Sequence, residues 1–429
     1  MPQENKKKER VKKMIKFGKW VVKFRIPILI LSFLLLIPTG IIYMNTRINY
    51  DILSYLPGDI ETMKGQDILL DEFGTGAFSV AVIDGMQEKE ISQLEDKLKE
   101  IDHVKDVLWY GALADISIPM DMLPDDLKDS LQNADTGSQL MIITFDTSMS
   151  ADETLDAIEE IRGLTNEQCL LSGMSAVVTD IKKICNSEVI MYVVIAAGLS
   201  ALVLALTMDS FLLPFIFLLS IGMAIVYNLG TNFIAGEISF VTQALAAVLQ
   251  LAVTMDYSIF LWHSYLENQE RYPDDRKRAM SHAISQTLTS VVGSSITTIA
   301  GFLAMCFMTF TLGMDLGVVM AKGVVFGVIG CVTILPSMIL AMDKWIEKTR
   351  HKAIIPDLGR IGGFVTKHYW IFIILFLVII GPAFYGQNHN QVYYDLMGTL
   401  PDNLESVKAG NALENDFDMG ATHVILATE

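Results

Sequence analysis

The sequence predicts a polytopic α-helical membrane protein that carries an extracytoplasmic α+β domain. The mean hydropathy is +0.41, and 52% of the 429 residues are apolar, which is high for a soluble protein. A helix of about 20 residues crosses a bilayer, and seven apolar stretches are long enough to do so. The predicted spans are residues 26–44, 188–207, 211–231, 238–262, 286–310, 317–341 and 369–386.

The placement of charge predicts the orientation of these spans. Residues 1–25 are strongly basic, and so are the loops at 263–285 and 342–368. Lys and Arg gather on the cytoplasmic side of membrane proteins. The segment 45–187 instead holds 28 acidic and 10 basic side chains, a net charge of −18 in a chain whose total is −17. We therefore expect a cytoplasmic N-terminus and an extracytoplasmic domain at 45–187.

Strand and helix patterns alternate within that outer segment. Apolar β-type runs predict four strands, and two amphipathic stretches predict helices at 88–101 and 151–163. The order βαβ–βαβ is that of a split βαβ, ferredoxin-like domain, with an irregular insert at 111–137 between the halves. A helical pattern from 174 to 187 runs into the second span, which predicts a domain seated rigidly on the membrane. The four predicted strands are residues 78–84, 103–110, 138–146 and 168–173.

Two cysteines, Cys169 and Cys185, share the outer segment and could form a disulfide. Four cysteines in the whole chain are too few for a disulfide scaffold. We therefore favour free thiols over a bridge at this pair.

An internal repeat indicates how the spans are organised. The stretch YDILSYLPGDIETMKG (50–65) follows the first span, and YDLMGTLPDNLESVKA (394–409) follows the seventh. An ungapped offset of 344 pairs the identical residues Asp51/Asp395, Pro57/Pro401, Glu61/Glu405, Lys64/Lys408, Phe73/Phe417 and Gly76/Gly420. One span, an outer domain and the five spans of 188–341 then form a unit of six spans, so the repeat is parallel.

The second unit begins after the basic linker 342–368 with the span 369–386. Residues 387–429 then correspond to the start of a second outer domain, and THVILAT (422–428) falls on FSVAVID at the same offset. We expect a second half of the same chain to follow; a naturally short protein with a C-terminal tail is the alternative.

This arrangement resembles the RND transporter superfamily, and its fourth span resembles the MMPL branch of bacterial lipid and drug exporters. The resemblance rests on the pair Asp256-Tyr257, and on SSITTIAGFLAM (294–305), LGMDLGVVMAKGVVFG (312–327) and LPSMIL (335–340). Spans two to six are also similar to a sterol-sensing domain. Mycobacterial members typically carry Gly-Thr before the pair, where this chain has Thr254 and Met255. The resemblance implies export across a bacterial plasma membrane, with partner residues of a proton relay in the second half.

Asp256 is the candidate proton carrier. It lies near the middle of the fourth span, where ionising a carboxylate costs several kcal/mol, so that ionised and neutral forms become comparably populated. A hydrogen-bonded structural aspartate is the alternative. Tyr257 is either a relay partner or a packing residue. The hydroxyls of Ser294, Ser295, Thr297 and Thr298, beside Gly293 and Gly301, either extend the relay or join helices.

Other polar residues of the spans receive plainer interpretations. Lys322 is an intramembrane charge that we expect to snorkel to the outer interface, with Asp315 as a possible partner, and Gln250 is interpreted as a packing residue. ERYPDDRKRAMSHAI (270–284) is typical of a cytoplasmic surface helix. The sequence contains no GxxxxGK[ST], HExxH or paired CxxC motif, so we expect no ATP drive, cofactor, metal site or enzyme activity, and no nucleic-acid partner.

The favoured function is therefore a proton-motive-force-driven exporter of hydrophobic or amphipathic molecules, either lipids or drug-like compounds. Its partners would be protons, membrane lipids, the substrate and the second half of the chain, with oligomerisation left open. Two alternatives remain: a protein-translocation accessory of the same superfamily, and a lipid-sensing module that transports nothing.

Overall fold

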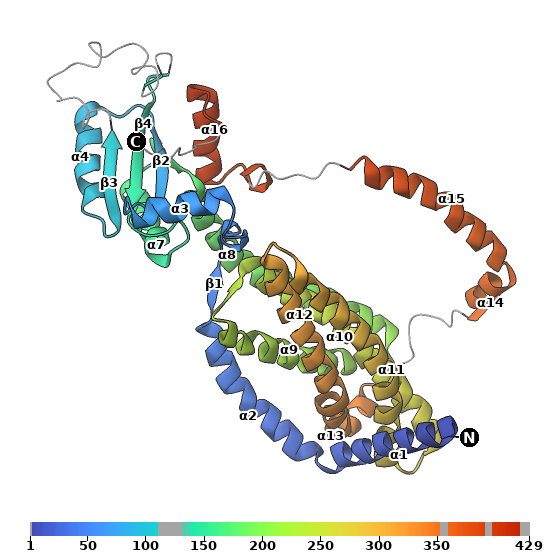
Figure 1. Ribbon diagram of the computed structural model, residues 1–429. Coiled ribbons are helices and arrows are strands. Elements are labelled where there is room, and N and C mark those ends of the chain that lie inside the picture. The colour runs from blue at the N-terminus through green and yellow to red at the C-terminus, as the bar shows by residue number, and fades with distance from the viewer. Residues whose placement is uncertain (1, 110–131, 134–135, 352–358, 391–396, 421–429) are drawn as a thin grey trace.

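The computed structural model describes residues 2–109, 132–133, 136–351, 359–390 and 397–420 (Figure 1). Within them, seven helical segments are long and apolar enough to cross a membrane, and each contains the core of one predicted span. The prediction of a multi-pass helical membrane protein is confirmed. These segments are Arg25–Met44, Met174–Thr207, Leu213–Ile234, Phe240–Arg271, Arg276–Phe307, Leu312–Lys348 and Tyr369–Asn388.

The membrane bundle is built from helices that pack side by side (Figure 1). Its buried core includes Phe217, Leu261, Tyr265 and Ile284. The basic N-terminus, α1, lies along α11, so closely that a Cβ at Gly18 would be 2.4 Å from the carbonyl oxygen of Ser281. The bundle helices are α1 (Pro2–Lys23), α2 (Arg25–Met44), α8 (Met174–Thr207), α9 (Leu213–Gly230), α10 (Phe240–Arg271), α11 (Arg276–Ala304), α12 (Leu312–Ile329) and α13 (Leu335–Lys348).

The seventh span stands apart from this bundle. Helix α15 (Tyr369–Asn388) follows the short α14 (Gly359–Lys367), and α15 buries no side chain against the described residues. Figure 1 shows α15 well away from α10 and α11.

Two features of the bundle differ from expectation. The predicted surface helix at 270–284 is wrong: α10 continues to Arg271, and the Asp275 side chain accepts from the backbone N–H of Arg278 to begin α11 at Arg276. The sixth span also changes geometry at Gly330–Ile334, which forms a π-helical turn. Pro336 lies two residues after this turn and has no N–H for the carbonyl four residues before it, which favours a wider turn at this point.

The outer segment contains one four-stranded antiparallel sheet in the order β3-β4-β2-β5. All four predicted strands are present, and the helices α4 (Glu88–Lys99) and α7 (Asp152–Leu164) follow β2 and β4 as expected. Ile91, Leu98, Ile158 and Ile161 of these helices pack with Ile143 of the sheet in one buried core. The strands are β2 (Ala77–Ile83), β3 (Val104–Trp109), β4 (Gln139–Phe145) and β5 (Cys169–Ser172).

Part of the opposite face of this sheet, at β5 and β2, is covered by α16 (Glu405–Phe417), which comes after the seventh span. Its Leu413 packs with Val80, Val82 and Leu140. Most of the predicted insert at 111–137, together with Asp395 and residues 422–428, lies outside the described residues.

The outer domain is continuous with the membrane bundle through α8, a single helix from Met174 to Thr207, as the sequence predicted. The four cysteines are all free, so Cys169 and Cys185 form no bridge. Burial raises the pKa of Cys169 to about 12, which keeps that thiol protonated and unreactive.

Candidate functional site in the membrane helices

Asp256 lies close to the middle of α10, on a face that the described residues leave open. Its side chain is exposed, and it makes no hydrogen bond or ion pair with any residue that the structure describes. Leu249, Ala252 and Phe260 are exposed on the same side at helical spacing. The fourth span therefore presents one ionisable group on an uncovered apolar stripe.

Tyr257 points to a different place from its neighbour. Its ring is buried, with 6% exposure, and packs in the bundle core. Its backbone oxygen accepts from Sγ of Cys331 at 3.3 Å, which lies in the π turn of the sixth span. No hydrogen bond joins Tyr257 to Asp256 in this structure, so the relay role of Tyr257 stays a prediction.

Ser294 lies at the same depth as Asp256 on the neighbouring helix. The helices α10 and α11 run antiparallel, and Oγ of Ser264 donates to Oε1 of Gln286 at 2.6 Å. Asp256 comes eight residues before Ser264, and Ser294 eight residues after Gln286. Since a helix rises 1.5 Å per residue, both lie about 12 Å further along the pair.

Three of the four candidate relay hydroxyls of α11, those of Ser295, Thr297 and Thr298, are bonded to their own helix. Ser295 is buried and donates to the carbonyl of Val291 at 2.7 Å. Thr297 and Thr298 donate to the carbonyl of Ser294 at 2.7 Å and 3.2 Å. Ser294 and Thr297 are exposed on the uncovered side of the bundle, so a relay through them remains a prediction.

The two glycines of this stretch make no close helix approach within the described chain. A Cβ at Gly293 or at Gly301 would have no atom of another described helix within 4 Å. The expectation of helix packing there is wrong for this part of the chain, because no described helix covers that face of α11.

The opposite face of α10 packs tightly against α9 and α12, and polar side chains take part in this contact; we call it the sealed side. Nδ2 of Asn228 donates to Oε1 of Gln250 at 3.0 Å, so Gln250 is a hydrogen-bonding residue and not simple packing. A Cβ at Gly323 would be 2.7 Å from Nδ2 of Asn228, and one at Gly327 would be 2.6 Å from Oγ1 of Thr254. Only glycine lets α12 approach this closely.

Sequence reasoning missed this sealed contact, although a signal was present. Asn228 is an amide inside a predicted span, and the two glycines of α12 repeat at a spacing of four. An amide and a small-residue repeat in separate spans are typical of a helix contact in membranes.

Lys322 has a different partner from the one suggested by the sequence. The side chain is half-buried, and its Nζ contacts Oδ1 of Asn232 and forms no recorded ion pair with Asp315, so snorkelling to the outer interface stays a prediction. Asp315 instead binds the start of α10: its Oδ2 accepts from the backbone N–H of Ser239 at 2.9 Å and from Oγ1 of Thr242 at 2.6 Å. A carboxylate at a helix N-terminus is stabilising.

The same end of α10 is joined to the outer domain. Strand β1 (Arg47–Asn49) pairs in parallel with β6 (Glu237–Ser239), which leads into α10. Nδ2 of Asn49 donates to Oε1 of Glu237 at 3.0 Å, and the rings of Tyr50 and Phe240 stack at 5.9 Å. Burial raises the pKa of Tyr50 to about 12, so its hydroxyl stays protonated. It donates to Oδ1 of Asn186 at 3.0 Å.

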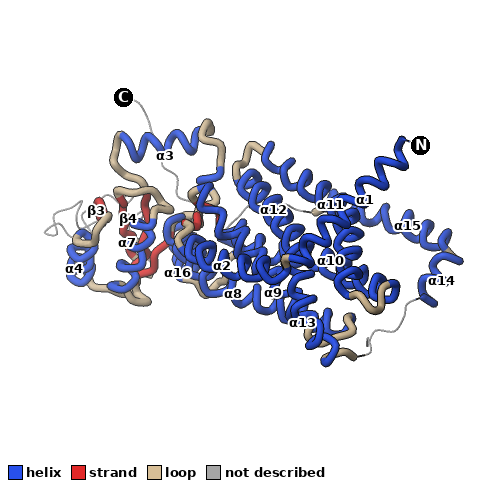
Figure 2. The backbone as a smooth tube through the Cα atoms, turned by 90° about the horizontal axis from the view of Figure 1, so that it is seen from below, coloured by secondary structure: helices blue, strands red, loops and turns tan. Residues whose placement is uncertain are grey.

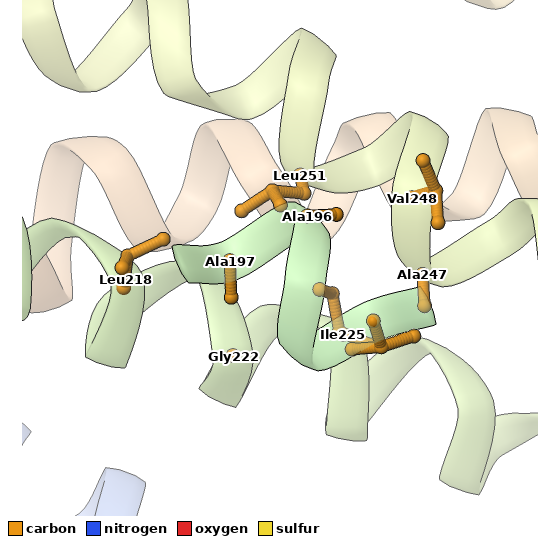
Figure 3. A pocket seen from close by; sticks show the side chains of 9 residues that line it. Ala196, Ala197, Leu218, Gly222, Ile225, Ala247, Val248 and Leu251 are labelled. Carbon is orange, nitrogen blue, oxygen red and sulfur yellow. The ribbon is translucent and has the colours of Figure 1, made fainter. Parts of the chain in front are cut away.

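A separate apolar crevice opens between α8, α9 and α10. Figure 3 shows side chains of the three helices, among them Ala197, Leu218 and Val248, around a shared space with Gly222 at its wall. Every lining residue is apolar. Among the residues the structure describes, no three His, Cys, Asp or Glu side chains gather into a metal-binding group.

Comparisons with known proteins show which family the chain belongs to. A family model described as the MMPL family matches residues 74–368. The probable transport protein MmpL12 of Mycobacterium tuberculosis is 24% identical over 370 residues, which cover 82% of this chain and 30% of MmpL12. The apo-petrobactin exporter of Bacillus anthracis is 20% identical over 418 residues, covering 85% of this chain and 55% of the exporter.

A solved structure of SecDF in its super-membrane-facing form aligns with a TM-score of 0.40 at 13% identity, over 76% of this chain and 39% of SecDF. The chain therefore spans less than two thirds of the length of MmpL12, of the exporter and of SecDF.

Proposed function

Because the chain belongs to the MMPL family of membrane transporters, we propose that it exports hydrophobic or amphipathic molecules, lipids or drug-like compounds, at the expense of the proton-motive force. Asp256 is the proton carrier. The observation that carries the proposal is a carboxyl group in the middle of a membrane helix, on a face with no covering residue in the described chain.

That face is unsuited to contact with lipid. Charged side chains inside membranes almost always face a bundle interior or a water-filled cavity, because exposure to hydrocarbon costs several kcal/mol. Asp256 and Ser294 lie at the same depth, beside Gly293, whose missing side chain leaves room for another helix. The second half of the transporter, meeting this side of α10 and α11, supplies the rest of the proton path.

A proton on Asp256 changes the charge of this face, and with it the packing that the face prefers. Neutral Asp256 favours close helix contact, whereas the ionised form favours water or a cationic partner. The start of α10 is tied to α12 by Asp315 and to β1 through β6. Movement of α10 in response to protonation would therefore reach the outer domain.

The outer domain fits the role of a porter domain on the substrate path. Its strand order β3-β4-β2-β5 and its two βαβ connections support the assignment to a split βαβ, ferredoxin-like unit, and the continuous helix α8 supports a rigid connection to the second span. The Lys- and Arg-rich N-terminus and the basic loops at 263–285 and 342–368 favour the cytoplasmic side for those segments, and hence the outer side of the plasma membrane for this domain. Cysteines placed at Asp96 or Lys99 should then react with a membrane-impermeant maleimide on intact cells, and cysteines at Glu270 or Asp274 should not.

The test uses the complete transporter in vesicles with an imposed pH gradient, and follows fluorescent amphipathic dyes and fluorescent phospholipids. Asp256→Asn keeps size and hydrogen bonding but cannot carry a proton, so gradient-driven export should collapse while expression is retained. Asp256→Glu moves the carboxyl by roughly 1.5 Å and should leave partial activity, since relay geometry is exacting.

Ala252→Asn is the matched control. It adds an amide one turn away on the same open side of α10 and removes no carboxyl, so export should largely survive. Full gradient-driven export by Asp256→Asn would refute the proton role, and the alternative of a structural aspartate would then hold.

A lipid-sensing module without transport is the second candidate, and the apolar crevice is the observation that favours it. A Cβ at Gly222 would meet no atom within 4 Å, so Gly222→Leu fills the crevice without a clash at its first carbon. A lipid sensor should lose binding of a photoactivatable acyl-chain probe in Gly222→Leu and be indifferent to Asp256→Asn. An exporter should instead lose dye export in Asp256→Asn and be less affected by Gly222→Leu.

A further inference from the structure

Helix α1 lies across the end of the bundle that is remote from the outer domain (Figure 1). It ends at Lys23, and the first span begins at Arg25, so α1 starts where that span leaves the membrane. Figure 2 shows α1 beside α11 in a view from this end. A helix in this position is either covered by protein on all sides or shared between protein and lipid, and its three faces distinguish the two cases.

One face of α1 is packed on the bundle. Val21 and Val22 are 0% and 5% exposed and belong to the bundle core. A side chain at Gly18 would collide with the carbonyl of Ser281 in α11. The helix is therefore held firmly against α11 on this side.

A second face of α1 carries aromatic rings that the described chain leaves uncovered. The ring centroids of Phe17 and Trp20 are 6.1 Å apart, and those of Trp20 and Phe24 are 5.6 Å apart. Trp20 is 51% exposed and Phe24 is 38% exposed. Tryptophan gathers at the headgroup level of membranes, because its ring is apolar and its N–H is polar. This face is typical of a helix that lies in the membrane surface.

The third face of α1 is a stripe of lysines. Lys12, Lys16, Lys19 and Lys23 recur at intervals of four, three and four, which places them within about 60° around the helix. All four are exposed, and none forms an ion pair with a residue that the structure describes. Like charges at this spacing destabilise a helix, so the stripe favours an anionic partner.

A basic side chain of the bundle extends this stripe. The guanidinium of Arg278, near the start of α11, lies 4.5 Å over the ring of Tyr272, and this ring stacks on His282 at 5.1 Å. The charges of Arg278 and Lys19 both act on His282. A cation of α11 and a cation of α1 therefore lie near the same ring.

The acidic side chains that form ion pairs at this end of the bundle bind other cations. Asp343 and Glu347 both bind Arg276, and Glu267 pairs with Arg271 at 3.4 Å. Lys16, Lys19 and Arg278 are left without an ion pair in the described part of the chain.

We propose that α1 and the start of α11 bind the headgroup of an anionic phospholipid in the adjacent leaflet. Lys16, Lys19 and Arg278 contact the phosphate and the negative headgroup through charge-assisted hydrogen bonds. Trp20 and Phe24 lie at the upper part of the acyl chains of the same leaflet. The inference does not depend on the proton role of Asp256.

Another part of the protein fits these two faces less well than lipid does. A protein surface over the lysine stripe would have to supply a matching row of acids, because ammonium groups buried without partners cost several kcal/mol each. An anionic phospholipid combines a negative headgroup with apolar chains, and α1 places a basic stripe beside an aromatic face in the same way. Basic side chains near an anionic membrane surface are attracted to it.

The aromatic face is tested by tryptophan fluorescence of the complete transporter in nanodiscs. The phospholipids carry bromine near the headgroup end of the acyl chains and quench rings that they touch. The difference between the parent and Trp20→Phe isolates the signal of Trp20, and we expect this signal to fall by more than half in brominated discs. A Trp20 signal of equal intensity in brominated and ordinary discs would overturn the proposal, since protein would then cover the ring.

The headgroup contacts are tested by native mass spectrometry of the delipidated complete transporter, titrated with phosphatidylglycerol or phosphatidylcholine of the same acyl chains. Lys16→Gln/Lys19→Gln should weaken the tightest binding of phosphatidylglycerol about 25-fold, because each basic side chain near an anionic surface contributes roughly fivefold. Arg278→Gln, on the other helix, should weaken it about fivefold and gives an independent reading. Binding of phosphatidylcholine should stay unchanged.

Lys344→Gln/Lys348→Gln is the matched control, since it removes two exposed lysines from the end of α13 and should retain tight binding. Lys16→Arg/Lys19→Arg keeps both charges and should bind like the parent. Equal losses in the two double glutamine variants would overturn the proposal, because net charge alone would then account for the binding. Unchanged affinity in Lys16→Gln/Lys19→Gln would overturn it as well.

Discussion

The two sides of α10 carry polar groups in opposite circumstances. On one side, Gln250 bonds to Asn228, and Thr254 lies against the glycine face of α12. On the other, Asp256 meets no described partner, and Gly293 and Gly301 of the adjacent α11 face open space. Thr254 and Asp256 are two residues apart, which places them about 200° apart around the helix.

The polar groups on one side of α10 hold helices together, whereas the carboxyl group on the other side is free to exchange protons. Amides and small residues in the sealed side stabilise the bundle in the way expected of membrane helices. A lone carboxyl on the open side contributes no contact within the described chain, so stability of this part does not explain its presence. Variants on the sealed side should therefore change folding, and removal of the carboxyl group on the open side should change transport.

The largest expected effect on folding comes from filling a glycine of the sealed side. A Cβ at Gly327 would be 2.6 Å from Oγ1 of Thr254, and Gly327→Leu should destabilise the bundle by about 1–3 kcal/mol through overpacking. Gly293→Leu has open space around its Cβ and should not destabilise residues 1–429, because leucine also has the better helix propensity. Thermal unfolding in detergent measures the stability of both variants. Equal losses of stability in Gly327→Leu and Gly293→Leu would contradict the proposed difference between the two sides of α10.

A smaller effect is expected from the hydrogen bond between Asn228 and Gln250. Asn228→Leu or Gln250→Leu leaves a buried amide without its partner and should cost on the order of 1 kcal/mol. The double variant removes both amides, so its loss should be smaller than the sum of the single losses. A double-mutant cycle on the unfolding free energy measures the coupling; strict additivity would mean that the bond contributes nothing.

The smallest effect on stability is expected for the hydroxyls of α11. Thr297→Val removes a bond to the helix's own carbonyl on an exposed face and should change stability by less than about 0.5 kcal/mol. If Thr297 belongs to the proton path, export by the complete protein should nevertheless fall. Ser295→Ala, at a buried position one helix face away, is the comparison. Equal export by Thr297→Val and the parent would exclude Thr297 from the path.

Much of the fold could be predicted because its signals are local. The lengths of the apolar stretches predicted the seven spans. The alternation of strand patterns with two amphipathic helical patterns predicted the outer sheet. The π turn at Gly330–Ile334 was missed, because Pro336 signals a disturbance but not its form. The partners of Lys322 and Gln250 were missed as well, since they lie in other spans and hydrophobic periodicity does not report which spans meet.

The candidate site was only partly predictable for a related reason. The position of Asp256 within a span follows from the sequence alone. Its exposure depends on which helices pack around α10, and the packing of α9 and α12 on the side of Thr254 leaves the side of Asp256 open.

The central claim, that Asp256 exchanges protons, can be tested without knowing the substrate. Infrared difference spectra of the complete protein in lipid, recorded as the medium is acidified, report the stretching band of a newly protonated carboxyl. We predict a band in the wild-type protein that is missing from Asp256→Asn and retained in Ala252→Asn. Spectra of the wild-type protein and Asp256→Asn that superimpose at every pH would contradict the account.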